Sequence, residues 1–134
     1  MYQTKLTWRD GWALDAHTVN GHTIIVDGKK NDGASPMEFF VIGLVGCTTV
    51  DVISILEKMR QDIKALEVEL EADHKEEFPR YITTIRMNYW VKGKDIEEAK
   101  LKRAIELSHE RYCSALHSLR PDVKVETNYK IENE

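Results

Sequence analysis

The chain has 134 residues, of which 42% are hydrophobic, so its length favours a single domain over residues 1–134 with a core of its own. Its formal net charge of -4 at pH 7 excludes the strongly basic surface that attracts nucleic acids or anionic membranes. The N-terminus has no apolar leader, and the longest uninterrupted apolar run, residues 39–46, is shorter than the ~20 residues that span a bilayer. We therefore expect a cytoplasmic protein with no membrane partner.

Short alternating runs predict β-strands in the first part of the chain. They cover residues 5–8, 12–19 and 22–26. Between the second and third runs, Asn20-Gly21 predicts a hairpin with a type I′ turn, because that turn needs positive φ at both central residues.

A long apolar helix follows. Residues 35–38, Ser-Pro-Met-Glu, form a capping box with proline at the first helical position, and the helix is expected to run to about Arg60. Its first half, from residue 39 to 50, is apolar on every side, and Gly43 and Gly46 would let another backbone come close. Since the chain has few elements to cover such a helix, we expect a homodimer.

The second half of the chain alternates again and then forms a second helix. Residues 63–72 and 85–91 predict half-buried strands, and residues 123–131 predict a last one. A second capping box at residues 95–98 opens a helix that we expect over residues 95–112. The order βββ-α-ββ-α-β predicts an α+β fold with helices packed on antiparallel sheet.

Two cysteines, Cys47 and Cys113, carry the candidate chemistry, and no CxxC motif is present. In a reducing compartment they are either small buried residues or partners in redox chemistry. His109 lies one turn before Cys113, so a zinc site made of the two thiols and this histidine is conceivable. The chain contains no metal-binding motif with established spacing, however, and we expect no metal.

The surroundings of Cys47 decide whether its thiol reacts. Gly43, Asp51 and Ser54 share its face of the helix. No lysine or arginine lies on this part of the helix, and apolar surroundings keep a thiol inert. A cation that favours the thiolate must come from elsewhere in the fold. Arg9, in the WRDGW segment, is the candidate, although a solvated turn arginine is the commoner case.

Three stretches together resemble the OsmC/Ohr family of cysteine-based hydroperoxide reductases. They are WRDG, NDGASPMEFFVIGLVGCTTVDV and SHERYCSAL. The resemblance covers nearly the whole chain, is most specific in the S-P-x-E-x₈-C segment, and is closest to the OsmC-like branch. It implies the OsmC-like fold, in which antiparallel sheets wrap around two central helices in an intertwined homodimer with active sites at the subunit interface.

The resemblance also implies roles for single residues. Cys47 falls on the peroxidatic thiol of the family and Cys113 on the resolving thiol. Arg9 falls on the arginine that would hold the thiolate and polarise the peroxide. The position of the family's catalytic glutamate falls on Met37, and Glu38, one residue later, is a weak catalytic candidate because the capping box already explains it.

The implied activity is thiol-dependent reduction of organic hydroperoxides in oxidative-stress defence. It would pass through a Cys47 sulfenic acid and a Cys47–Cys113 disulfide, which an external dithiol resets without a bound cofactor. Met37, Phe39 and Phe40 would line an apolar binding pocket. Because Met37 replaces the glutamate, a non-enzymatic small-molecule-binding or redox-sensing protein on the same scaffold stays open. Sulfur or acyl carrier chemistry on Cys47 is a third alternative.

Overall fold

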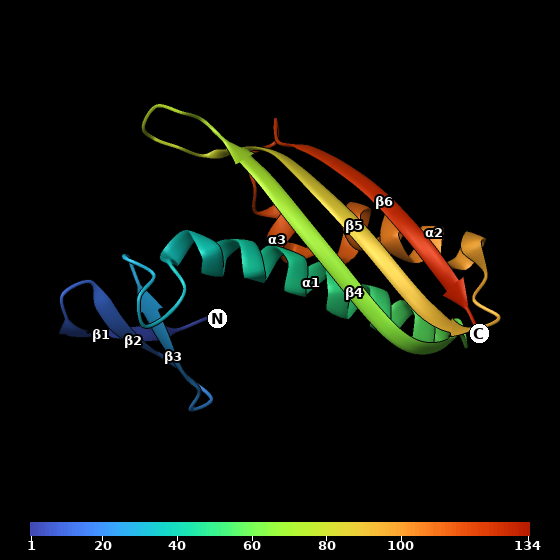
Figure 1. Cartoon of the computed structure of the whole chain (residues 1–134), viewed down its shortest axis with the longest axis horizontal. Helices are drawn as coiled ribbons and strands as arrows, with labels where there is room; N and C mark the ends of the chain where they lie inside the picture. The colour runs from blue at the N-terminus through green and yellow to red at the C-terminus, as the bar shows by residue number, and fades with distance from the viewer. The chain divides into compact units, whose positions relative to one another are not determined.

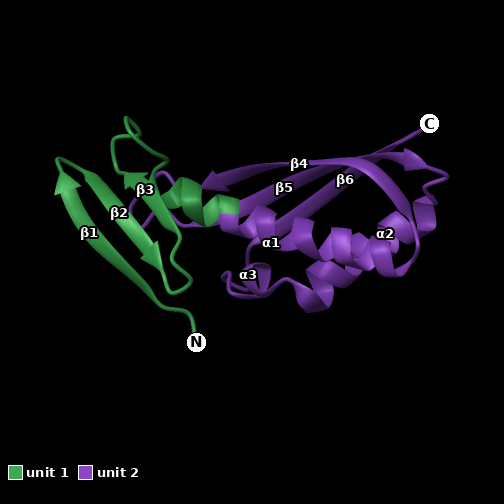
Figure 2. Cartoon of the chain, turned by 90° about the horizontal axis from the view of Figure 1, so that it is seen from below, with its two compact units in different colours: residues 1–42 green, residues 43–134 purple.

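A computed structural model describes residues 1–134, which form two compact units. Unit 1 comprises residues 1–42 and unit 2 comprises residues 43–134 (Figure 2). The boundary falls inside helix α1 (Pro36–Lys58), so one continuous helix belongs to both units. The single OsmC-like domain over residues 1–134 stays a prediction.

Unit 1 is built on an antiparallel sheet of three strands in the order β1-β2-β3 (Figure 1). These strands are β1 (Thr4–Asp10), β2 (Ala13–Thr18) and β3 (Thr23–Asp27). The strand pairs follow the predicted alternating runs, so the three predicted N-terminal strands are confirmed.

The hairpin between β2 and β3 is confirmed, but its predicted type I′ turn is wrong. The Gly21 N–H donates to the Thr18 carbonyl at 3.1 Å, which places Val19 and Asn20 at the centre of the turn. Gly21 alone has positive φ, at 87°. The loop is therefore a longer hairpin connection, in which the turn is followed by one glycine in the left-handed conformation.

Helix α1 begins as the sequence predicts. The Ser35 N–H donates to Glu38 Oε1 at 3.0 Å, and the Glu38 N–H donates to Ser35 Oγ at 3.2 Å. This reciprocal pair confirms the capping box. At the other end, Arg60 has a positive φ of 60°, a conformation that ends the helix.

By length and composition alone, α1 could cross a bilayer. An 18-residue window of the helix has a mean hydropathy of 2.2. The uninterrupted apolar run covers only residues 39–46, but the short polar residues in the rest of this helix barely lower its mean hydropathy. Core helices share this property, and within unit 2 the helix buries a stripe of side chains at four-residue spacing: Leu44, Thr48, Val52 and Leu56.

Unit 2 contains a second three-stranded sheet, in the order β4-β5-β6, with helices on one face (Figures 1 and 2). The strands are β4 (Asp62–His74), β5 (Ile82–Lys94) and β6 (Lys124–Asn133). The inward side chains of β5 are almost fully buried: Ile85, Met87, Tyr89 and Val91. β4 and β5 pair antiparallel, as expected.

The third strand of this sheet differs from the prediction, because β6 pairs parallel to β5, with Tyr89 opposite Tyr129. Helix α2 (Glu98–Leu107) lies between the two strands in sequence. It carries the chain back to the end at which β5 started, as a crossover between parallel strands requires. The α+β class is confirmed, whereas an all-antiparallel sheet is wrong.

The predicted start of the second helix is wrong, whereas its predicted end near Tyr112 is confirmed. Asp95 has a positive φ of 54°, and the N-cap residue is Glu97 without a side-chain cap, so the capping box at residues 95–98 is wrong. The Gln61 side-chain oxygen accepts from the Glu97 N–H instead, at 2.8 Å. Helical structure continues to Tyr112, although the α-helix itself ends at Leu107. A π-helical turn, η1 (Ser108–Tyr112), and the short helix α3 (Ser114–His117) follow it.

Candidate active site

The two cysteines and one carboxylate meet in unit 2. Cys47 Sγ, Cys113 Sγ and a carboxylate oxygen of Asp51 all lie within 4.8 Å of one another. Helix α1 supplies Cys47 and Asp51, which are one turn apart, and Cys113 follows η1. Cys113 is completely buried, while Cys47 and Asp51 are half-buried. The structure thus brings together the two thiols that sequence analysis singled out.

The π-helical turn η1 sets the position of Cys113. Its closing hydrogen bond runs from the Cys113 N–H to the Ser108 carbonyl at 2.8 Å, across five residues rather than four. Cys113 itself has extended backbone, and its sulfur accepts from the Leu116 N–H at 3.5 Å. π-Helical turns occur frequently at functional sites. The sequence predicted a continuous helix here, because no residue pattern distinguishes a π turn from an α turn.

A chain of buried hydrogen bonds extends from the thiol cluster. Ser108 Oγ donates to Asp51 Oδ2 at 3.0 Å and lies 2.9 Å from Thr48 Oγ1. Thr48 Oγ1 lies 2.9 Å from the Tyr89 hydroxyl, which lies 2.7 Å from His109 Nε2. No buried side-chain nitrogen or oxygen lacks a partner. The network is therefore fully satisfied, which makes it rigid and specific.

Sequence analysis missed three members of this chain: Thr48, Tyr89 and Ser108. Each lies within an element that the sequence predicted: Thr48 and Ser108 in helices and Tyr89 in a strand. The sequence did carry one signal for these residues: each has a hydroxyl at a position that is expected to be buried. Buried hydroxyls need hydrogen-bond partners. The partners themselves come from different elements, so they could not be identified from local patterns.

Burial shifts the titration of several groups in this region. It raises the pKa of the Cys113 thiol to about 11, although the hydrogen bond from the Leu116 N–H acts against this. Burial also raises the pKa of Tyr89 to about 12 and lowers the pKa of His109 below its usual range. At neutral pH Cys113 is thus a thiol rather than a thiolate, Tyr89 keeps its proton and His109 is neutral.

The side chains of the thiol cluster include types that bind zinc. Two thiolates and a carboxylate can coordinate a metal ion, and the 4.8 Å cluster consists of these groups. His109 is not part of that cluster, because its Nε2 faces the Tyr89 hydroxyl. The conceivable zinc site of the two thiols with this histidine therefore does not match the observed cluster.

The remaining predicted site residues belong to unit 1. Arg9 lies on β1, where its Nε is 3.7 Å from Asp15 Oδ2. Its interaction with Cys47 stays a prediction. Glu38 is engaged in the capping box and lies 3.9 Å from Lys30 Nζ. Hydrogen bonds from the Ser35 backbone and hydroxyl hold the pKa of Glu38 below its usual range.

The predicted binding residues differ in exposure. Met37 and Phe40 expose 52% and 45% of their surface, whereas Phe39 is half-buried. All three lie in the first turns of α1. Apolar side chains this exposed can contact an apolar ligand or a second protein surface.

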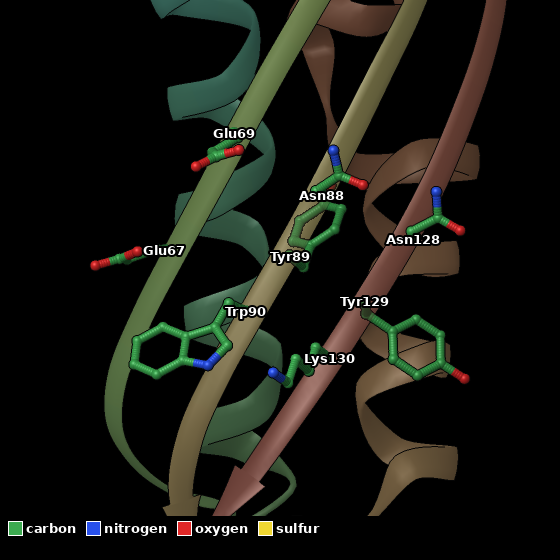
Figure 3. A pocket seen from close by; sticks show the side chains of 8 residues that line it. All are labelled: Glu67, Glu69, Asn88, Tyr89, Trp90, Asn128, Tyr129 and Lys130. Atoms are coloured by element: carbon green, nitrogen blue, oxygen red, sulfur yellow. The ribbon is translucent and has the colours of Figure 1, made fainter.

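Three hollows lie in unit 2, and the smallest, of about 150 Å³, is lined by His109, Leu116, His117 and Val125. An open groove of about 480 Å³ runs beside the thiol cluster, and its lining includes Asp51, Lys58, Leu107 and Tyr112. A shallower pocket of about 250 Å³ lies over the strands of the second sheet (Figure 3). Charged and amide side chains border that pocket: Glu67, Glu69, Asn88, Asn128 and Lys130. Neither cysteine lines any of these hollows, but the groove includes Asp51, a member of the thiol cluster.

Comparisons with known proteins match nearly the whole chain. The family profile OsmC, for OsmC-like proteins, matches residues 28–128. Protein YhfA of Escherichia coli (strain K12) is 38% identical over 130 residues, which cover 96% of this chain and 97% of that protein.

Solved structures agree with this match. The crystal structure of a hypothetical protein from Aquifex aeolicus VF5 superposes with a TM-score of 0.90 at 27% identity, covering 100% of this chain and 98% of that one. The organic hydroperoxide resistance protein OhrB of Bacillus subtilis shares the fold, with a TM-score of 0.61 at 19% identity over 96% of this chain and 98% of its own.

Proposed function

This chain belongs to the OsmC family of proteins, and from that membership we propose that it defends cells against oxidative stress by reducing organic hydroperoxides with its two thiols. One observation carries the proposal: the sulfurs of Cys47 and Cys113 lie within 4.8 Å of each other, although they are 66 positions apart (113 − 47). A modest rotation of the side chains would bring the sulfurs to bonding distance.

The proposed reaction has three steps. The Cys47 thiolate attacks the terminal oxygen of the hydroperoxide, the O–O bond breaks, and the alkoxide leaves as an alcohol after it takes up a proton. The Cys113 thiol then attacks the resulting sulfenic acid, so that a disulfide forms and water leaves. An external dithiol reduces the disulfide by two exchange reactions and is itself oxidised. No bound cofactor is needed.

A second copy of the chain would complete the site. Val50 and Ile53 on α1 expose 65% and 37% of their surface, and an added Cβ on Gly43 or Gly46 would meet open space. This apolar face supports the proposed homodimer, because monomeric proteins seldom leave such a surface uncovered.

Residues outside unit 2 would bind the peroxide. In the proposed dimer, Arg9 would hold the thiolate, and Met37, Phe39 and Phe40 would line the pocket for an apolar peroxide. Bound nucleic acid and a membrane partner have no place in this proposal, and a cytoplasmic location suits the two free thiols.

A redox-sensing or small-molecule-binding protein is the second candidate. Met37 stands where the resemblance puts the family's catalytic glutamate, and Glu38 is engaged in the helix cap. A protein without that glutamate would be oxidised once by a peroxide and would signal that state instead of turning over.

The decisive experiment exposes the reduced protein to cumene hydroperoxide and counts free thiols. We expect both thiols to disappear and one disulfide to form. Cys47→Ser should not react, and Cys113→Ser should stop at a sulfenic acid that dimedone traps. Peroxide consumption by Cys47→Ser equal to that of the wild type would contradict the proposal. With dithiothreitol present either protein would be recycled, so the rate decides: fast peroxide consumption supports the enzyme, whereas slow consumption supports the sensor.

The role of Arg9 can be tested separately. Arg9→Ala should slow the alkylation of Cys47 by iodoacetamide near neutral pH, because a nearby cation favours the thiolate. Lys5→Ala, on the same strand, is the matched control. Equal alkylation of the Arg9 variant and the wild type would remove Arg9 from the proposed site.

A further inference from the structure

We propose that Asp51 transfers a proton between the two thiols while the disulfide forms. Its carboxylate takes the proton of the Cys113 thiol and gives it to the hydroxide that leaves Cys47. The inference rests on the proposed function and names the group that makes its second step possible.

The position of Asp51 suits this task. Its carboxylate lies within 4.8 Å of both sulfurs, and it is the one carboxylate in the cluster. Ser108 Oγ donates to Oδ2 at 3.0 Å, which leaves Oδ1 free to serve the thiols. A general base must reach the proton that it removes directly or through one water molecule, and such contacts tighten only in the reacting complex.

The second step needs a base because of where Cys113 lies. Its side chain is 0% exposed, so bulk water has little access to its proton. The thiolate is the nucleophile in thiol chemistry, whereas a buried thiol in apolar surroundings is unreactive. A carboxylate beside both sulfurs makes the buried thiol reactive, because it can accept the Cys113 proton while the S–S bond forms. No free thiolate then has to exist in the apolar interior.

The buried chain of hydrogen bonds orients the Asp51 carboxylate. An ionised carboxylate accepts hydrogen bonds only, and each hydroxyl has a single proton to donate. Because Ser108 donates to Asp51, Thr48 must donate to Ser108. The contact between Thr48 and Tyr89 then needs the Tyr89 proton, for which Met87 Sδ, a weak acceptor 3.4 Å from the hydroxyl, competes. His109 must then donate its Nε2 proton to Tyr89. When Tyr89 donates to Thr48, every proton in the chain points toward Asp51.

The proposed step is balanced. The proton of Cys113 moves to the Asp51 carboxylate, and the electron pair left on its sulfur forms the bond to the Cys47 sulfur. The S–O bond of the sulfenic acid breaks, and the departing hydroxide takes the proton from Asp51 as water. The sum is thiol plus sulfenic acid giving disulfide plus water, with Asp51 ionised again.

The Asp51→Asn variant distinguishes the formation of the sulfenic acid from the formation of the disulfide. The amide oxygen can still accept from Ser108, but the amide cannot carry a proton. We expect sulfenic acid to form at the wild-type rate or faster, because a negative charge near Cys47 is removed. Disulfide formation should slow by at least about tenfold, so that dimedone captures a larger share of the protein. Disulfide formation at the wild-type rate would overturn the inference and leave the proposed function intact.

The pH dependence gives a readout that a structural role would not change. In Asp51→Asn the rate of disulfide formation should rise steeply with pH, as more Cys113 becomes thiolate. The wild-type rate should depend on pH much less. An equally steep rise in both proteins would overturn the inference. The titratable groups that face this region come from α1, β5 and the turn after α2: Cys47, Asp51, Lys58, Tyr89, His109, Tyr112 and Cys113.

Two further variants complete the experiment. Glu57→Gln makes the same chemical change at an exposed position of α1 and should behave as the wild type in both steps. Ser108→Ala removes the donor that orients Asp51, and it should also slow the second step selectively, even if Asp51→Asn fails to fold. Wild-type protein that forms no sulfenic acid would instead refute the proposed function, and the role of Asp51 with it.

Discussion

The hydroxyl of Tyr89 lies 2.7 Å from Nε2 of His109 and joins strand β5 to the turn after α2. Tyr89→Phe removes this hydroxyl, so Thr48 Oγ1 and His109 Nε2 each lose a hydrogen-bond partner. A buried group that loses its hydrogen bond costs about 1–3 kcal/mol, so the free energy of unfolding should fall by that amount. Urea denaturation measures this change in the free energy of unfolding.

Tyr129→Phe is the matched control for this change. The Tyr129 hydroxyl donates to Glu98 Oε1 at 2.8 Å in an exposed position, where water can replace it. The control should leave the urea midpoint almost unchanged. Equal midpoints for the two variants would show that the buried chain adds little to stability.

The pKa of His109 predicts a loss of stability in acid. Burial lowers this pKa in the folded protein, whereas the unfolded chain keeps the usual value near 6.5. As the pH falls through that value, the unfolded state takes up a proton that the folded state does not, so the free energy of unfolding decreases. Urea denaturation on both sides of that pH should show the decrease. His109→Gln should reduce it, whereas exposed His22→Gln should not.

The pKa of Cys113 predicts slow alkylation. In Cys47→Ser the remaining thiol should react poorly with iodoacetamide near neutral pH, because its pKa is raised to about 11. The rate should climb with pH toward that value, and mass spectrometry can follow it. The same variant in urea should react at the rate of an ordinary thiol. If the folded and unfolded protein react equally fast, Cys113 is not shielded.

Glu38→Gln distinguishes a helix cap from a catalytic group. Glutamine can still accept from the Ser35 N–H, so the melting temperature should stay near that of the wild type, and peroxide turnover should persist. Glu38→Ala should lower the melting temperature, because the capping box is lost. A Glu38→Gln variant that melts normally but loses about tenfold or more in turnover would make Glu38 catalytic.

Val50→Glu tests the homodimer. Val50 exposes 65% of its surface within the chain, so a charge there should leave the fold of one subunit intact. Buried against a second copy, the same charge would be costly, and the variant should sediment as a monomer. Glu67→Gln on β4 of the second sheet is the control and should stay dimeric. A wild-type protein that sediments as a monomer would contradict the proposed assembly.

Local rules predicted much of this fold. The capping box at residues 35–38 and the alternating strands depend on neighbours in sequence, and both are confirmed. The same rule failed at residues 95–98, because a distant side chain, that of Gln61, satisfies the Glu97 N–H. The parallel pairing of β6 also depends on the path of the chain through α2, which strand patterns do not contain.

The candidate site was predictable only in part. The two cysteines were evident in the sequence, and helical spacing placed Asp51 on the face of Cys47. That the sulfurs approach each other depends on how α1 packs within unit 2 and on the turn after α2. The chain from Asp51 to His109 draws on three elements, so tertiary structure alone assembles it.

The π-helical turn from Ser108 to Tyr112 makes the number of residues in this segment part of the candidate active site. Deleting one residue there would let the helix continue in ordinary α register, and each residue of that register turns the chain by about 100°. Cys113 would then leave the helix in a different direction, although every side chain of the site was kept. A one-codon deletion in this turn should therefore be as damaging to the chemistry as the loss of a cysteine, and transplanting the site into another scaffold must preserve this spacing.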